Sequence, residues 1–365
     1  MIAPDGRHKI LLMNTLLPIA QQFADSVTEI SPLGNGLIND TFLITTASSH
    51  FVLQRINRKV FPAPEQIMVN LIMLNRHLEQ KSSFAVKLKI PAILKTTSNH
   101  DFYLDEQGDY WRALGFIGNT DSLETISHIN QAQQAGFALG HFHRLVSDLD
   151  PLRLHDTLPG FHIAPGYLSH YHQVLAQAPG QLAPESLYCS AFIAKFEHLT
   201  DDLETAKQQG LLPLRVIHGD PKLNNFLFDK DNKKIVSIID LDTVKPGLVH
   251  YDIGDCLRSC CHRLESNEFD LDICAALLTS YLSEASAFFS DHDYHYLYEC
   301  LQLIPFELGL RFYTDYLEGN RYFKVSVPEQ NLERAAGQFQ LCESIMAQEL
   351  AIKSLIDQLK SQWFS

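Results

Sequence analysis

The sequence has little of what marks nucleic-acid-binding, exported or membrane proteins. Its 29 Lys and Arg are outnumbered by 43 Asp and Glu, and the resulting net charge of -14 argues against a nucleic-acid partner, whose phosphates it would repel. No apolar run reaches the roughly 18 residues that a transmembrane helix needs. The first twenty residues lack a clean hydrophobic segment followed by a cleavage site. Neither membrane attachment nor a signal peptide is therefore expected.

Cysteine is scarce and unpaired by spacing. The seven cysteines are odd in number and form no CxxC motif, which predicts a reduced, cytoplasmic location. The cluster CLRSCCHRLE (256–265) lacks zinc-ligand spacing, so we interpret it as a helix with buried thiols. His141 and His143 would diverge on a helix, which excludes them as a metal pair. A G-x-x-x-x-G-K-[ST] motif is also missing, and this excludes a P-loop NTPase.

The order of predicted elements indicates an α+β protein of two lobes. The 365 residues are many for a single core. Residues 1–118 contain short strand patterns at 42–46, 51–56 and within 101–117, with a helix at 64–81. Residues 119–365 begin with a helical pattern at 129–149 and are mostly helical from about 265. We therefore expect a small β-rich N-terminal lobe and a larger, mostly helical C-terminal lobe.

The chemistry-bearing residues gather in HGDPKLNNFLFDKDNKKIVSIIDLDTVKPG, residues 218–247. Two apolar strands, 225–229 and 235–240, flank the turn 230–234. Antiparallel pairing around a turn centred on Asn232 puts Asn225 opposite Ile239. A slip of one or two residues would still bring Asn225 close to Asp240. Asp242 shares a face with Asp240 if the strand continues.

Carboxylate and amide oxygens at one hairpin mouth suit Mg²⁺, which usually takes one or two carboxylates and the phosphates of a substrate. Asp220, on the loop entering the hairpin, can accept the proton of an attacking hydroxyl. This division of roles is that of kinase-type phosphoryl transfer. Turn-capping Asp and Asn residues are the alternative. The combination H-G-D-x-x-x-x-N with a following I-I-D favours the phosphotransferase interpretation.

These residues resemble the aminoglycoside phosphotransferase and choline kinase superfamily, relatives of the protein kinases. The blocks GNGLINDTF, FVLQRIN, LPLRVIHGDPKLNN, IIDLDTVKPG, YDIGDCLR and LRFYTDYLEGNRYF look closest to bacterial N-acetylhexosamine 1-kinases and span residues 34–323. The resemblance implies a bilobal protein-kinase-like fold and an enzyme that uses ATP and Mg²⁺. It implies Asp220 as the base, Asn225, Asp240 and Asp242 on the metal, and Asp252 with His218 as structural supports of the loop.

The resemblance also implies a nucleotide side in the first lobe. GNGLINDTF precedes a strand, as in the glycine-rich lid of kinases, rather than a helix as in a Rossmann fold. The phosphate-pairing lysine of kinases is replaced by Gln54, with Arg55 on the opposite face. Adenine is expected against the linker near 115–117. The residues expected to bind the nucleotide are Gly34, Gly36, Asn39, Gln54, Arg55, Phe116 and Ile117.

For the acceptor, the resemblance implies Arg311, His162 and Tyr322 as contacts and an N-acetylhexosamine phosphorylated at its anomeric hydroxyl. One alternative keeps the fold but changes the acceptor to another sugar, an aminoglycoside, choline or homoserine. Another is a non-catalytic nucleotide-binding pseudokinase, which the presence of Asp220, Asn225 and Asp240 disfavours.

Overall fold

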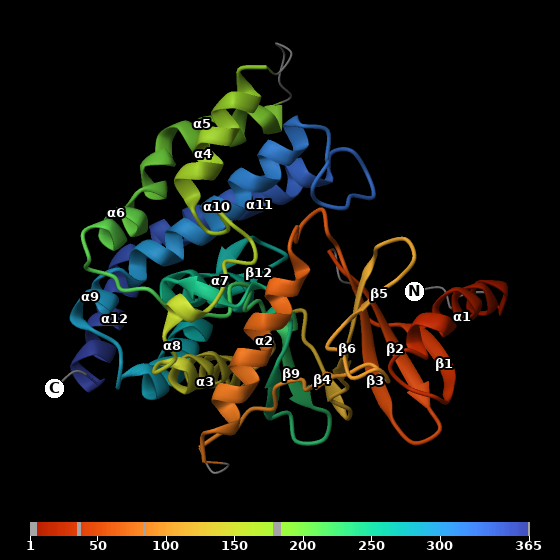
Figure 1. Cartoon of the computed structure of the whole chain (residues 1–365). Helices are drawn as coiled ribbons and strands as arrows, with labels where there is room; N and C mark the ends of the chain where they lie inside the picture. The colour runs from red at the N-terminus through yellow and green to blue at the C-terminus, as the bar shows by residue number, and fades with distance from the viewer. Residues whose placement is uncertain (1–5, 35–37, 83–84, 178–183, 364–365) are drawn as a thin grey trace. The chain divides into compact units, whose positions relative to one another are not determined.

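The computed structural model describes residues 6–34, 38–82, 85–177 and 184–363. The chain divides into two compact units (Figure 1). The first comprises Met1–Ser82 and Lys89–Asn119, and the second comprises Ser83–Leu88 and Thr120–Ser365. The first unit is built on a β-sheet and the second is mostly helical, as the strand and helix patterns predict.

Within its described residues, the first unit carries a six-stranded antiparallel sheet in the order β1-β2-β3-β6-β4, with β5 pairing β6. The elements are α1 Gly6–Ala20, β1 Val27–Pro32, β2 Asp40–Thr46, β3 His50–Ile56, α2 Pro64–Glu79, β4 Ile93–Leu94, β5 Tyr103–Leu104 and β6 Tyr110–Gly115. The register places Thr41 opposite Gln54 and Gln54 opposite Arg112. These three side chains therefore share one face of the sheet.

The other face of this sheet is covered by α1, a helix that the sequence did not predict. Pro18 interrupts its apolar run, yet the helix continues to Ala20. Leu16 and Ala20 pack with Phe51 and Trp111 in a buried cluster. A proline near a helix end removes one hydrogen bond, whereas burial of the apolar face stabilises the whole helix. The packing of α1 on the sheet therefore outweighs the tendency of Pro18 to end the helix.

The second unit is a helical body with short strands inserted near its start. Its helices are α3 Ile129–Val146, α4 Ala164–Leu175, α5 Pro184–Phe196, α6 Asp202–Gln208, α7 Val249–Cys260, α8 Leu271–Ala285, α9 Asp291–His295, α10 Leu297–Leu317, α11 Gln330–Ala347 and α12 Glu349–Trp363. Its strands are β7 Thr120–Asp121, β8 Arg215–Ile217, β9 Phe226–Asp229, β10 Ile235–Ile238, β11 Lys245–Gly247, β12 His262–Arg263 and β13 Glu268–Phe269. One hydrophobic core joins α4, α5, α10 and α11. Figure 1 shows these four helices grouped together. None of the described helices combines the length and apolar character needed to cross a bilayer.

The predicted hairpin is present, with one extra strand. β9 and β10 pair antiparallel, and the Ile239 N–H donates to the Asn225 carbonyl at 2.9 Å. The predicted pairing of Asn225 with Ile239 is thus confirmed. The sequence did not reveal that β7 joins β9 to make a three-stranded sheet.

The cysteine cluster is buried in and around α7. All seven cysteines are free thiols with buried side chains, as the helix interpretation predicts for Cys256 and Cys260. The pKa of Cys256 is raised by its contact with Cys260 and by burial. These thiols pack as small apolar groups rather than as reactive ones.

Two glycines on α3 allow α8 to pack against it at backbone distance. A Cβ at Gly136 would lie 2.1 Å from the Leu277 carbonyl oxygen, and one at Gly140 would lie 2.6 Å from the Tyr281 carbonyl oxygen. Because α8 supplies backbone at these points, a rotamer change cannot relieve the overlap.

We expect Gly136→Ala to lower the free energy of unfolding by about 2–3 kcal/mol, since the methyl group must push α8 away. Gly166→Ala is the matched control, because this helical glycine has open space where the added methyl group would lie. The control should be unchanged or more stable by up to about 0.5 kcal/mol, because alanine favours helices. Urea denaturation followed by circular dichroism measures both. Equal stability of the two variants would contradict this account of the α3–α8 packing.

Candidate active site

The loop that carries Asp220 follows β8 and is held by a buried carboxylate. Asp252, in the first turns of α7, is fully buried. It accepts the His218 N–H at 2.6 Å through Oδ2 and the Gly219 N–H at 2.8 Å through Oδ1. The Asp220 N–H donates to His218 Nδ1 at 3.3 Å. All three backbone donors of residues 218–220, the catalytic loop, are therefore paired.

The three carbonyls of the catalytic loop are also fixed by side chains. Thr243 Oγ1 donates to the first at 2.8 Å, His162 Nε2 to the second at 2.8 Å, and Asn225 Nδ2 to the third at 2.7 Å. Each backbone polar group of the loop thus has a partner from another segment or from the His218 ring. Such pairing fixes the position from which the Asp220 side chain projects.

His218 and Gly219 are at these positions for steric and hydrogen-bonding reasons. His218 Nε2 donates to the Ile239 carbonyl at 3.0 Å while Nδ1 accepts, so the ring is neutral. Burial lowers the pKa of His218 and agrees with this state. Gly219 has φ +87°, and a Cβ there would lie 2.5 Å from the Thr243 carbonyl oxygen. Only glycine suits both constraints.

Asp252 is itself held by a chain of polar groups that the sequence did not reveal. His143 Nε2 donates to Asp252 Oδ2 at 2.8 Å, and Tyr281 pairs with His143 Nδ1 at 3.0 Å. Burial alone would raise the pKa of Asp252, but His143 and His218 outweigh it and lower the pKa. Asp252 therefore stays ionised inside the protein.

The Asp220 carboxylate is contacted by a lysine and an amide that follow the loop in sequence. Lys222 Nζ lies 2.5 Å from Asp220 Oδ2, and Asn225 Nδ2 lies 3.4 Å from the same oxygen. Burial lowers the pKa of Lys222, but Asp220 and Asp240 outweigh it and raise the pKa, so the amine is charged. Within the described chain, no group bonds Asp220 Oδ1. One carboxylate oxygen is thus fixed and the other is available to a substrate.

Asn225 and Asp240 were expected to hold a metal, and their surroundings fit that chemistry. Since Asn225 uses its NH₂ group on the catalytic loop, its oxygen is directed elsewhere. Asp240 is exposed and has a left-handed conformation, with φ +65°. No cluster of three His, Cys, Asp or Glu among the described residues could hold a metal alone. The set fits Mg²⁺ only if phosphate oxygens complete it, which is the usual arrangement for Mg²⁺.

Asp242 does not share a strand face with Asp240. β10 ends at Ile238, and Leu241–Thr243 form a 3₁₀ turn after the left-handed Asp240. The condition for the shared face, a strand continuing past 240, is therefore not met. Asp242 is buried, with 2% of its surface exposed, and its carbonyl accepts from Thr157 Oγ1.

On the first unit, Gln54 lies between a hydroxyl and a buried cation. Arg112 donates to Gln54 Oε1 through Nε at 3.0 Å and Nη2 at 2.7 Å. Gln54 Nε2 donates to Thr41 Oγ1 at 3.1 Å. Arg112 is 1% exposed. A positive charge therefore lies on the neighbouring strand, next to Gln54.

Arg55, the other expected cation, is engaged elsewhere. Its guanidinium bonds Asp40 Oδ2 at 2.5 Å and Asp109 Oδ2 at 2.9 Å, on the sheet face opposite Gln54. The first carboxylate also raises the pKa of Arg55. Because two carboxylates hold its guanidinium, the Arg55 side chain does not reach around the strand toward Gln54.

The remaining nucleotide-side residues are described in part. Gly34 has φ +70°, a conformation suited to glycine. Gly36 lies outside the described residues. Asn39 Oδ1 accepts the Asn57 N–H at 3.0 Å and so ties the turn before β2 to the end of β3. In the linker, Phe116 is 37% exposed and Ile117 is half-buried.

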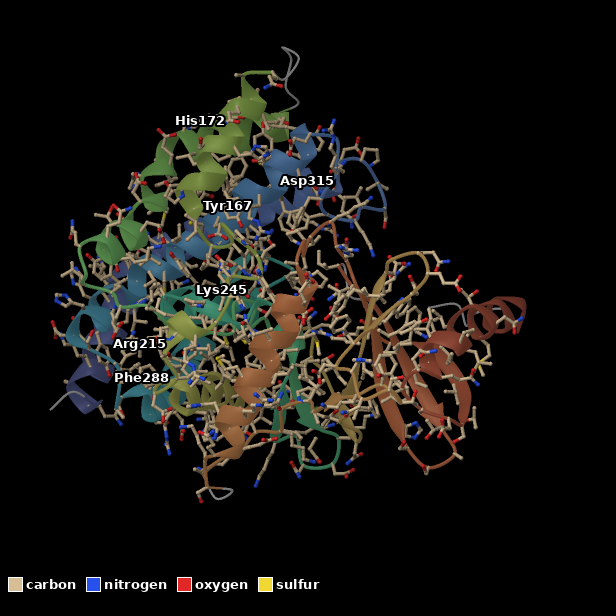
Figure 2. The ribbon with its side chains drawn as sticks, viewed as in Figure 1. Tyr167, His172, Arg215, Lys245, Phe288 and Asp315 are labelled. Carbon is tan, nitrogen blue, oxygen red and sulfur yellow. The ribbon has the colours of Figure 1, made fainter. Side chains whose placement is uncertain are left out.

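Arg311, on α10, is surrounded by aromatic rings in the second unit. Tyr167 comes from α4, which packs against α10 (Figure 2). Within the described residues, Arg311 makes no hydrogen bond, and its nearest carboxylate is Glu307 at 3.9 Å. Burial lowers the pKa of Arg311, but Tyr167 and Glu307, with smaller contributions from Tyr322 and Asp220, outweigh it and raise the pKa. The ring centroids that lie 5.0–5.9 Å from the Arg311 guanidinium, the Arg311 cluster, belong to Phe161, Tyr167, Tyr322 and Phe323.

The expectation that His162 lines an acceptor cleft needs correction. Its side chain is buried, and both ring nitrogens are bonded, to Glu307 Oε1 and to the Gly219 carbonyl. A ring with both polar atoms occupied by the protein has none left for a substrate. Tyr322, by contrast, is 44% exposed beside Arg311.

Sequence reasoning missed several residues of this arrangement. Lys222 carried the only local signal, since it stands two residues after Asp220 in HGDPK. Arg112, His143, Thr243 and Glu307 act on partners far along the chain, and no local pattern marks them.

Comparison with known proteins identifies the class of this arrangement. The phosphotransferase enzyme family matches residues 29–288, well over half of the chain, and the chain belongs to this family. The predicted superfamily is thereby confirmed. The narrower resemblance to N-acetylhexosamine 1-kinases stays a prediction.

Solved structures of other phosphotransferases share the fold at low sequence identity. A microcompartment-associated aminopropanol kinase is 17% identical with a TM-score of 0.64, over 93% of this chain and 99% of that one. A spectinomycin phosphotransferase in complex with ADP and spectinomycin is 13% identical with a TM-score of 0.60, over 93% and 98%. Choline kinase from Cryptosporidium parvum Iowa II is 14% identical with a TM-score of 0.60, over 97% and 100%. These likenesses confirm the α+β, protein-kinase-like fold.

We expect Asp252→Asn to lower the free energy of unfolding by about 2–4 kcal/mol, because an amide cannot accept at both positions and leaves a buried N–H unpaired. The control Asp357→Asn, on the exposed face of α12, should stay within about 0.5 kcal/mol of wild type.

The pH dependence of this loss has a defined sign. Since the folded pKa of Asp252 is lowered, its contribution is present above the unfolded value of about 3.9 and disappears as pH falls through the folded value. Urea titrations between neutral and acidic pH should show the two proteins converge at low pH. A constant difference at all pH values would contradict an ionised Asp252.

Proposed function

We propose that this phosphotransferase is an ATP-dependent kinase that phosphorylates the anomeric hydroxyl of an N-acetylhexosamine. The observation that carries the proposal is the catalytic loop. All six backbone polar groups of residues 218–220 are hydrogen-bonded, and one Asp220 carboxylate oxygen stays available, beside a charged lysine and the oxygen-ligand pair Asn225 and Asp240.

In the proposed reaction, Asp220 orients the acceptor hydroxyl and takes its proton. The acceptor oxygen forms a bond to the γ-phosphorus while the bond to the ADP oxygen breaks, and the proton ends on Asp220 Oδ1 or leaves to solvent. Lys222 holds the other carboxylate oxygen and supplies positive charge next to the reacting groups. Asn225 and Asp240, with Asp242 close in sequence, would hold Mg²⁺, which when bound neutralises phosphate charge.

The first unit would provide the nucleotide contacts. ADP is present in the spectinomycin phosphotransferase complex, and this supports an adenine nucleotide for the present fold. Gly34, Gly36 and Asn39 belong to the proposed phosphate lid, and Gln54 would donate its amide to phosphate. Phe116, with its exposed ring, and Ile117 are proposed to contact adenine.

The positive charge of Arg311 supports an acceptor without a positive charge of its own. Aminopropanol and choline, named for two of the similar structures, carry an amine or a quaternary ammonium group. Aromatic rings often enclose such cations. Here the rings of the Arg311 cluster already enclose a guanidinium, which would repel a second cation and donate hydrogen bonds to hydroxyl or carbonyl oxygens. A sugar with hydroxyl and acetamido oxygens fits that chemistry.

An amino alcohol is the second candidate, supported by the same neighbours and by Glu307. The Oε2 atom of this buried carboxylate has no hydrogen-bond partner among the described residues. It would attract an ammonium group if Arg311 moved away. In the present arrangement Arg311 lies 3.9 Å from Glu307 and balances part of its charge, so the sugar is favoured.

Replacing Asp220 with Asn keeps its shape and removes the base. We expect turnover to fall at least about 10²-fold, with affinity for ATP nearly unchanged. Asp231→Asn, in the exposed hairpin turn, is the control and should match wild type. Steady-state kinetics and calorimetric titration of the nucleotide measure the two quantities. Turnover within about threefold of wild type would remove Asp220 from this role.

The acceptor is tested by blocking the anomeric oxygen. Free N-acetylglucosamine or N-acetylgalactosamine should stimulate ATP consumption, and the methyl glycosides should not, because they lack the reacting hydroxyl. Choline and aminopropanol should be inactive with wild type. Stimulation by an amino alcohol alone would overturn the sugar assignment. Equal use of free sugar and methyl glycoside would overturn the anomeric position.

A further inference from the structure

His162 lies at an unusual point of the second unit. Its backbone is left-handed, with φ +66°, and its side chain is 4% exposed. The preceding segment is fixed by Lys245, labelled in Figure 2, which donates to the carbonyls of Leu158 at 3.4 Å and Phe161 at 3.1 Å. The imidazole stacks on the Tyr251 ring with centroids 5.3 Å apart. Both the chain and the ring are therefore held in place.

The hydrogen-bond partners of His162 determine its proton count. Nδ1 meets Glu307 Oε1 at 3.1 Å, and Nε2 meets the Gly219 carbonyl at 2.8 Å. An ionised carboxylate and a carbonyl accept hydrogen bonds and donate none. The ring must supply a proton on each side, so it is an imidazolium while Glu307 is ionised.

Two other buried histidines have the opposite arrangement. His218 accepts the Asp220 N–H at Nδ1, and His141 accepts the Lys87 N–H at 3.1 Å at Nε2. A ring nitrogen that accepts carries no proton, so both rings are neutral. Burial lowers the pKa of each, in agreement. The surroundings of His162 differ from those of these two rings, because neither of its ring nitrogens meets a donor.

We propose that His162 is a charged positioning residue, which ties the Glu307–Arg311 pair of the acceptor side to the carbonyl immediately before Asp220. The inference rests on the proposed function, because it gives Asp220 and Arg311 their roles. If Glu307 or Arg311 moved, the hydrogen bonds of the His162 imidazolium would transmit the shift to the loop that carries Asp220. Distortion of that loop would misplace the Asp220 carboxylate by a distance that matters for proton transfer.

The charges around His162 support the imidazolium. Glu307 faces it from α10 and Asp255 from α7, while Arg311 offsets part of the Glu307 charge at 3.9 Å. Tyr251 and Tyr167 are neutral, since burial raises the pKa of each phenol. Asp220 and Lys222 stand as an ion pair beyond Gly219. Burial by itself lowers the pKa of His162, but Glu307 and the Gly219 carbonyl outweigh it, and the pKa is raised.

A raised pKa fixes the direction of the pH effect. The bridge is fully formed below the ordinary histidine value of about 6.5 and weakens as pH rises through the folded value. Loss of the proton at alkaline pH leaves either Glu307 or the Gly219 carbonyl without a donor. Turnover should therefore fall on the alkaline side, with the KM for ATP little changed.

The protonation state can be read without any activity. Nitrogen-15 spectra of the histidine-labelled full chain at about pH 7.5, a unit above the ordinary histidine pKa, should show a ring with protons on both nitrogens whose signal is lost in His162→Gln. His218 and His141 provide singly protonated references in the same spectrum. A neutral His162 ring at that pH overturns the proposal, whether or not the protein phosphorylates a sugar.

Kinetics then tests the coupling, with the acceptor that the substrate screen identifies. Glu307→Gln keeps an acceptor oxygen but removes the charge, so the alkaline fall in kcat should move to lower pH. His162→Gln should reduce kcat about 10²-fold with KM for ATP within about twofold. His172→Gln, on the exposed side of α4, is the control and should match wild type. An unchanged alkaline limb in Glu307→Gln, or an unaltered kcat in a folded His162→Gln, overturns the coupling.

Discussion

The pairing of the Asp252 carboxylate with two successive backbone N–H groups is the interaction on which the site depends. An ionised carboxylate without partners in a protein interior would be strongly destabilising. The catalytic loop supplies two donors and His143 a third, so the charge is stable only while the loop keeps its conformation. The hydrogen bonds that stabilise the buried Asp252 carboxylate are thus the same ones that position Asp220. Fold stability and site geometry are linked by this one group.

The loop is also constrained from its carbonyl side, and the constraints come from different parts of the second unit. Thr243 follows the hairpin, Asn225 precedes it, and the segment before α4 contributes His162. A loop with all its polar groups paired is rigid, whereas one paired only on its N–H side could still rotate its peptide planes. The N–H contacts therefore stabilise the loop conformation. The carbonyl contacts prevent rotation of its peptide planes and so fix the direction of the Asp220 side chain.

The sequence predicted the features that depend on contacts between residues close together in the chain. It did not predict those that depend on residues far apart. The hairpin, its register at Asn225 and helix α3 depend on neighbours within a few residues, and their patterns predict them correctly. His143 reaches Asp252 across 109 residues. No local periodicity encodes that contact, so the supports of the loop could not be derived. Helix α1 shows the converse, since the local penalty of Pro18 predicts a break that tertiary packing removes.

The nucleotide side shows how a missing charge can be replaced at a different position. A lysine at position 54 would place its ammonium directly on the strand face, whereas Gln54 offers a neutral amide. Arg112 donates twice to the oxygen of that amide, and hydrogen bonds in series polarise one another, so the Gln54 N–H groups become stronger donors. Thr41 takes only one of the two N–H groups. If Gln54 contacts phosphate as we propose, its second N–H group would do so, and Arg112 would contribute its charge from the neighbouring strand, where low polarity strengthens that charge. In the proposed function, Arg112 would therefore supply from β6 the positive charge that Gln54 on β3 lacks.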